Sequence, residues 1–90
     1  MIKAVVDIEK SIMAVDAELH ADLESALLGR GSVQENLWGI NLYLEKKIND
    51  WIDYVALINI RPSMENRSME IQDPKIRDKI KKIVESLVID

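Results

Sequence analysis

The segment at the C-terminal end of the chain, "DPKIRDKIKKIVESLV" (residues 73–88), constrains the fold most. Asp73 is a good N-cap and Pro74 suits the first position of a helix. The apolar residues that follow recur at helical spacing and form one stripe, with lysines on the opposite face: Ile76, Ile80, Ile83, Val84 and Leu87, against Lys75, Lys79 and Lys82. Such a helix becomes stable when its stripe packs on another apolar surface, so the sequence predicts a layered fold.

Four segments have the pattern of strands, and they supply that surface. We expect a first strand from about Ile2 to Ile8 and a second over residues 12–19, joined as a β-hairpin. In the second, alternate residues share one face: Met13, Val15, Ala17 and Leu19. The two best strand patterns are "ENLWGINLYL" (35–44) and "DYVALINIRP" (53–62), whose connection we expect Trp51 and Ile52 to tuck against the core.

The segment between the two pairs of strands is ambiguous. The alternation of Leu19, Ala21 and Leu23 is compatible with more strand, whereas "LESALL" consists of helix-forming residues. Asp22 as N-cap, with Gly29 and Gly31 as stop signals, favours a short helix from about residue 22 to residue 29. The prediction is an α+β single domain over residues 1–90, with the order ββαββα. Its four-stranded, mainly antiparallel sheet carries both helices on one face.

Composition excludes several classes of protein. The chain has no cysteine, which excludes disulfides, thiolate catalysis and cysteine-based zinc sites. No window approaches the roughly 20 apolar residues that span a bilayer, and charges come too early for a signal peptide. We therefore expect a cytoplasmic protein without membrane contact. The net charge of −4 argues against nucleic-acid binding, which requires a cationic surface.

The first candidate site is "ELHAD" (residues 18–22). If this stretch is extended, Glu18, His20 and Asp22 project on one side and form a plausible facial set for a divalent metal. His20 and Glu18 are also the candidates for acid/base catalysis, because the histidine pKa lies near neutrality. The alternative is structural: Asp22 caps a helix, His20 bonds a backbone group and Glu18 is solvated. We prefer this alternative and predict no metal or other cofactor.

The second candidate is a polar set in the two best strand patterns. Asn59 and Arg61 are two residues apart and share a face of a strand, and Asn41 lies opposite them if the strands pair. Arg61 holding a carboxylate or phosphate, with both asparagines as neutral donors, would form an anion site. Alternatively, this face is exposed, or the asparagines determine the register of the sheet.

The third candidate is the loop "RPSMENRS" (residues 61–68). Arg61 and Arg67 flank a turn that Pro62 and Asn66 favour, and two arginines on a loop can clamp an anion. Arg67 could equally pair with Glu65 or Glu70, in a surface contact of little energetic value.

The strings "KAVVDIEK", "AELHAD", "ENLWGINLY", "INIRPS" and "NRS" resemble a family of short bacterial and archaeal proteins of unknown function. The resemblance covers nearly the whole chain and includes the Gly31–Ser32 step and the "DPKIR" helix start. Members often have a segment before "KAVVDIEK" and a proline where this chain has Leu44. A missing N-terminal helix would leave apolar sheet surface for another chain, so the resemblance implies a homodimer. It implies no activity.

Two classes of function are compatible with these residues. The preferred one is a small binding module, expected to be a homodimer, that holds an anionic ligand or an acidic partner at the polar strand face and the arginine loop. Its ligand-binding residues would be Asn41, Asn59, Arg61, Asn66 and Arg67. The alternative is a small oligomeric hydrolase or lyase, with His20 as acid/base and Arg61 or Arg67 holding the substrate. That enzyme requires one pocket containing both His20 and an arginine.

Overall fold

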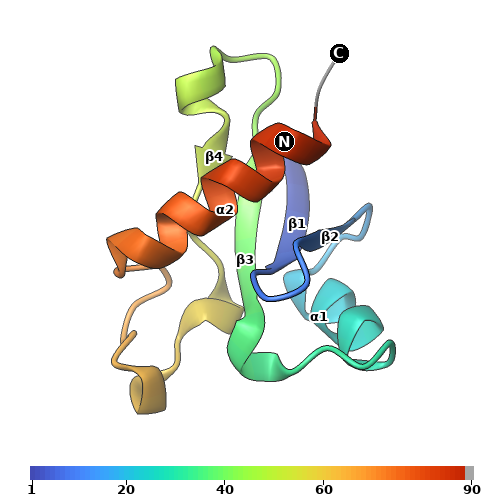
Figure 1. Ribbon diagram of the computed structural model, residues 1–90, viewed down its shortest axis with the longest axis vertical. Coiled ribbons are helices and arrows are strands. Elements are labelled where there is room, and N and C mark those ends of the chain that lie inside the picture. Colours follow the sequence, from blue (N-terminus) through green and yellow to red (C-terminus); the bar gives the residue numbers. More distant parts are fainter. Residues whose placement is uncertain (89–90) are drawn as a thin grey trace.

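A four-stranded antiparallel sheet forms the centre of the protein (Figure 1), in a computed structural model that describes residues 1–88. The strands are β1 (Ile2–Asp7), β2 (Ile12–Val15), β3 (Leu37–Leu42) and β4 (Ile52–Asp53), in the spatial order β2-β1-β3-β4. The helices are α1 (His20–Leu28) and α2 (Pro74–Leu87). The predicted α+β class, with an antiparallel sheet and two helices, is confirmed.

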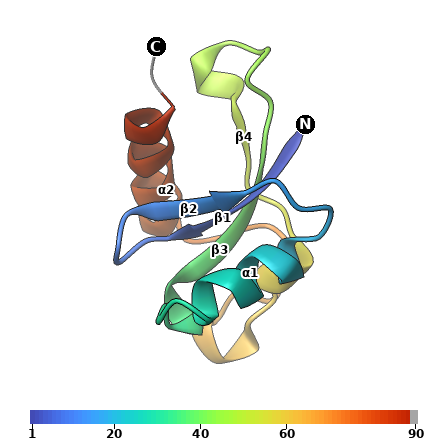
Figure 2. The same ribbon diagram turned by 90° about the vertical axis from the view of Figure 1, so that its right-hand side faces the viewer.

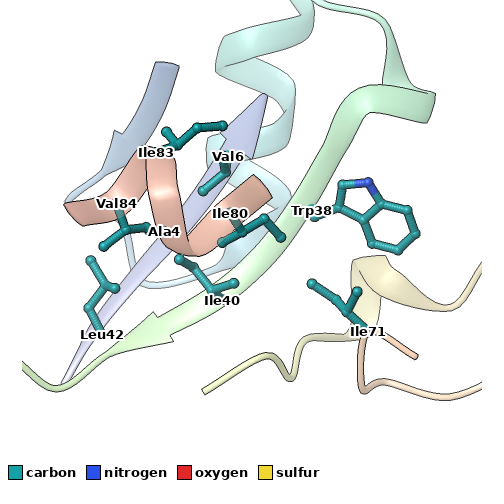
Figure 3. Close-up of a cluster of buried hydrophobic side chains, with 9 residues drawn as sticks. All are labelled: Ala4, Val6, Trp38, Ile40, Leu42, Ile71, Ile80, Ile83 and Val84. Atoms are coloured by element: carbon teal, nitrogen blue, oxygen red, sulfur yellow. The ribbon is translucent and has the colours of Figure 1, made fainter. Parts of the chain in front are cut away.

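The prediction that both helices cover one face is wrong. Ile80, Ile83 and Val84 of α2 pack on one face of the sheet, in the cluster drawn in Figure 3, together with Ala4, Val6, Trp38, Ile40, Leu42 and Ile71. On the opposite face, Leu23 and Leu27 of α1 pack on Val5 and Leu37. Figure 2 shows the two helices on either side of the sheet. Strands buried on both faces have continuous apolar runs, and "AVV" and "LWGI" are such runs.

The two helices differ in how well their sequence signals match their ends. In α2, Asp73 Oδ1 accepts a hydrogen bond from the Lys75 N–H at 2.8 Å, so Asp73 is the predicted N-cap. The first helix begins at His20, two residues earlier than predicted, and Leu19 at its N-cap makes no side-chain hydrogen bond. Asp22 therefore lies in the first turn, where its negative charge interacts favourably with the helix dipole and stabilises the helix.

The predicted strand over residues 53–62 is largely absent, which is the second error. Only Ile52 and Asp53 pair with β3, opposite Leu42 and Asn41. The chain then leaves the sheet and bridges to residues 69–71 through Val55, before a single 3₁₀ turn over Leu57–Asn59. Most of the outer edge of β3 is therefore covered by a loop. The predicted second strand also ends early, at Val15, because Asp16 has a left-handed φ of 73°.

The turn between β1 and β2 is built around a buried carboxylate. Asp7 Oδ1 accepts hydrogen bonds from the N–H groups of Glu9 and Lys10, both at 2.9 Å, and its Oδ2 accepts one from Ser32 Oγ at 2.7 Å. Burial alone would raise the pKa of Asp7, but these hydrogen bonds and the charge of Lys10 outweigh it, and the pKa is lowered. Asp7 thus joins the hairpin to the segment that follows α1.

Because Ser32 bonds this carboxylate, we expect the stability lost in Ser32→Ala to depend on pH. Because the folded pKa of Asp7 lies below its unfolded value of about 3.9, its contribution is present above about pH 4 and is lost as the pH falls through the folded pKa. Ser32→Ala should lower the free energy of unfolding by about 2 kcal/mol at neutral pH. In urea unfolding the cost should shrink near pH 2, with the exposed Ser63→Ala as control. An equal cost at both pH values would contradict the role of Asp7.

Candidate functional site

Asn59, in the middle of the predicted strand, completes the hydrogen bonding of β3. Its Oδ1 accepts from the Gly39 N–H at 2.8 Å, and its Nδ2 donates to the carbonyls of Gly39 at 2.9 Å and Met69 at 3.1 Å. Continuing the register of β3 and β4 would bring Val55 opposite Gly39. The side-chain amide therefore occupies the place of a strand peptide. Asn59 is fully buried, so a ligand would have to displace these bonds to reach it.

Asn66 has a similar role inside the loop. Its Nδ2 lies 2.7 Å from the carbonyl oxygen of Asn59, 3.0 Å from that of Ser68 and 3.1 Å from that of Glu70. Its Oδ1 accepts from the Gln72 N–H at 2.8 Å. An amide nitrogen has two hydrogens, so three close carbonyls already saturate it. The turn that this residue favours in the sequence is present, and its side chain holds the turn together.

The two arginines of the loop lie in different environments. Arg61 is 9% exposed, its guanidinium lies 4.7 Å from the centroid of the Trp38 ring, and its Nη2 is 3.4 Å from Glu24 Oε2. Burial lowers the pKa of Arg61, and the negative charge of Glu24 acts in the opposite direction. Arg67 is exposed. Neither of its predicted acidic partners is recorded in an ion pair with it within residues 1–88, and Glu70 pairs with Arg77 at 2.7 Å.

Asn41 is a predicted binding residue that borders an apolar hollow. Its Nδ2 donates to Asp53 Oδ2 and to the Val55 carbonyl, each at 3.1 Å. Because both partners only accept, the amide atom that faces them must be the nitrogen. The amide oxygen, Oδ1, therefore points elsewhere, and it is buried without a partner among residues 1–88. Asn41 thus bonds the chain where it leaves the sheet and underlies the space that this departure opens.

That space is an apolar groove of about 450 Å³, which we call the His20 groove. It lies between the start of α1 and the chain that leaves β4. Its lining is Met1, Lys3, Leu19, His20, Ala21, Asn41, Val55, Ala56, Leu57 and Met69. Four of these apolar side chains are exposed: Leu57 (71%), Met1 (61%), Leu19 (59%) and Met69 (40%). An exposed apolar patch around a hollow is typical of a binding surface.

His20 is held against the sheet at one side of the groove. Its Nε2 lies 2.8 Å from the carbonyl oxygen of Ile40. A carbonyl oxygen only accepts, so Nε2 carries the proton and Nδ1 of the neutral ring is an acceptor. The prediction that His20 bonds a backbone group is therefore confirmed.

The metal and enzyme hypotheses gain no support from this geometry. Glu18 precedes α1 while His20 and Asp22 lie within it, so the three are not spaced along one strand. Within residues 1–88 no group of three histidine or acidic side chains is placed to hold a metal. The His20 groove has no arginine in its lining. The pocket that the enzyme hypothesis requires, with His20 and an arginine together, is not formed there.

Sequence reasoning missed Lys3, Leu57 and Met69 of this groove. The alternation in "VALINI" led us to assign residues 53–62 to a strand, which placed Leu57 within a sheet instead of on an exposed turn. Asn59 was the available signal, since asparagine is disfavoured within strands and a buried amide requires partners.

The protein is therefore a small α+β domain, an antiparallel sheet with a helix on each face and an apolar groove where the chain leaves β4. The chain belongs to the family described as "Protein of unknown function (DUF5674)", whose model matches residues 1–87. Comparison with curated proteins and with solved structures gives no match. Over residues 1–88, no helix has both the length and the apolar character needed to cross a membrane.

Proposed function

We propose that this protein is a small interaction module that binds an apolar peptide segment carrying a carboxylate, at the His20 groove. The observation that carries the proposal is the groove itself: about 450 Å³ of space, lined mainly by apolar side chains, with exposed Leu57, Leu19 and Met69 around it. Apolar groups of a partner that entered this space would leave water, and that transfer is the main favourable term in association.

Charge favours an acidic segment over a basic one. Lys3 and His20 are the ionisable residues of the lining, and none of the lining residues is acidic. No carboxylate within residues 1–88 forms an ion pair with Lys3. The lining itself is therefore basic, in a chain of net charge −4, while the Asp53 carboxylate borders it at Asn41. A carboxylate near Lys3 would gain a charge pair, whereas an ammonium group there would be repelled.

The proposal moves the binding surface away from the arginine loop. The amides of Asn59 and Asn66 are already bonded to backbone groups, and Arg61 is buried beside Glu24. Of the residues predicted to bind a ligand, Asn41 alone lines the groove. Arg67 is exposed and its binding of an anion stays a separate prediction.

Three blocked five-residue peptides test the proposal. Each has leucine at its second and fourth positions, alanine at its ends, and aspartate, asparagine or lysine in the middle. We expect the aspartate peptide to bind with a Kd of about 0.1–1 mM, since so short a ligand buries little area. The asparagine peptide should bind up to about fivefold more weakly and the lysine peptide weakest, because an exposed charge pair contributes up to about 1 kcal/mol.

Two variants and a matched control separate the two parts of the interaction. Leu57→Asp should weaken the aspartate peptide at least about tenfold. The same change at the half-exposed Leu87 of α2 should have no effect. Lys3→Gln should remove the preference for aspartate over asparagine while leaving the asparagine peptide unchanged. Equal losses in the two aspartate variants, or no binding of any peptide at millimolar concentration, would refute the proposal.

A further inference from the structure

The strand β2 is an open edge of the sheet. It is hydrogen-bonded to β1 alone, and its outer side meets no other strand. Ile12 is 38% exposed and Val15 39%, and the strand "IMAV" contains no charge and no proline. Edge strands usually carry a charge, a proline or a bulge that prevents pairing with another chain. β2 has none of these within Ile12–Val15.

The register of the sheet shows which backbone groups of β2 are free. Gly39 turns its N–H and C=O away from β1, toward Asn59. Val5 lies opposite Gly39, so it turns its own groups away from β3, toward β2. There it faces Ala14, whose backbone groups therefore point back at β1.

The neighbours of Ala14 point the other way. Met13 and Val15 present their N–H and C=O groups at the outer edge, because backbone groups alternate along a strand. Neither residue has a recorded backbone partner on that side within residues 1–88. Two donors and two acceptors, arranged symmetrically about Ala14, match a second copy of the same edge running in the opposite direction.

We propose that two copies of this chain pair through β2, antiparallel and centred on Ala14. Met13 of each copy lies opposite Val15 of the other, and each of these two pairs exchanges two N–H···O=C bonds. The four-stranded sheets become one continuous sheet. The partly exposed side chain of Val15 packs on Met13 of the second copy.

Charge selects the antiparallel direction. Glu9 and Lys10 precede β2 and together carry no net charge, whereas Asp16 and Glu18 follow it. In the antiparallel pair, the approach to one strand, which includes Lys10, lies beside the acidic exit of the other. A parallel pair would bring the acidic exits together, which is unfavourable.

The oligomeric state and its response to Val15→Lys test the pairing. Sedimentation equilibrium from about 10 µM to about 1 mM should show a concentration-dependent dimer, as expected of a small interface. A lysine on an edge strand opposes pairing, so Val15→Lys should raise the dimer dissociation constant at least about tenfold. Val33→Lys, the same change at another exposed valine, should leave it unchanged. A wild-type protein that stays monomeric at about 1 mM overturns the proposal.

Amide hydrogen exchange of the wild-type protein identifies the dimer surface independently of the variants. The N–H groups of Met13 and Val15 should exchange more slowly as the dimer forms, while that of Ala14, already bonded to β1, should change little. In a mixture of labelled and unlabelled chains, isotope-filtered NOEs should join the α protons of Ala14 in the two copies. A dimer in which Met13 and Val15 exchange as in the monomer uses another surface and also overturns the proposal.

Discussion

Replacing Asn59 with alanine should lower the free energy of unfolding by about 3 kcal/mol. The substitution removes three hydrogen bonds, two of them buried, and leaves both backbone groups of Gly39 without their partner, while the Met69 carbonyl keeps the Ala56 N–H. Each buried polar group left unpaired costs about 1–3 kcal/mol, and water entering the space would recover part of this. Urea unfolding followed by the fluorescence of Trp38 and Trp51 measures the loss.

Two further substitutions give this prediction its controls. Asn49 lies on an exposed turn, so Asn49→Ala should change the stability by no more than about 0.5 kcal/mol. Asn59→Asp keeps an acceptor for the Gly39 N–H but loses the donor to Gly39 and Met69, and it buries a charge. It should therefore be as destabilising as alanine or more so. A stability of Asn59→Ala within about 0.5 kcal/mol of wild type would contradict the role of this amide as a substitute strand peptide.

Gly39→Ala is the second change with a large expected effect, a loss of about 3 kcal/mol or more. A Cβ at this position would lie 2.6 Å from Ala56 Cβ, 3.0 Å from Ile58 Cγ1 and 3.2 Å from His20 Cδ2. The first two neighbours cannot move without shifting the loop that Asn59 bonds to β3. Overpacking of this kind typically costs about 1–3 kcal/mol, and lost bonds between Gly39 and Asn59 would add to it.

The same substitution at Gly29 is the matched control. Gly29 lies at the end of α1 with φ −63° and ψ −18°, and a Cβ there would meet its nearest atoms at an ordinary 3.5 Å. Gly29→Ala should leave the stability unchanged or raise it by up to about 1 kcal/mol, because alanine restricts the unfolded chain. Thermal unfolding of the two variants compares them directly. Similar midpoints would show that the loop does not require a glycine on β3.

Elements whose local signals agree with their packing were predictable from sequence. In α2, the Asp73 cap, Pro74 and the apolar stripe all predict the same helix, and the helix forms over Pro74–Leu87. The placement of α1 was missed because a face of a sheet can be assigned only when its partner is known. The run "AVV" in β1 indicates burial on both faces, but it does not indicate which element covers each face.

Residues 53–62 show why the rest could not be predicted. Their alternation is that of a strand, yet only Ile52–Asp53 pairs with β3. A side chain 20 residues away along the chain from Gly39 supplies the missing hydrogen bonds. Strand propensity describes a fit to a half-buried surface and contains no information on such a long-range bond. The unusual asparagine was recognisable in sequence, but its partner was not.

The candidate site in the structure differs from the one predicted in the sequence for the same reason. Polar residues in the loop were correctly identified as unusual, and their proximity holds for Arg61 and Asn66, whose backbones bridge. The side chain of Asn66, however, is bonded within the fold, and that of Arg61 is buried beside Glu24, with Nε and Nη1 unpaired within residues 1–88. The His20 groove consists mainly of residues that look like core in the sequence, such as Leu57 and Met69, and that the departing chain leaves exposed.

The measurement that tests this account most directly is an NMR titration of ¹⁵N-labelled protein with the aspartate peptide, read residue by residue. We expect saturable shift changes at Lys3, His20, Asn41 and Leu57, in the groove, and none at Arg67, on the loop. Saturable changes confined to the arginine loop, with the groove unaffected, would contradict the account and restore the loop as the binding site.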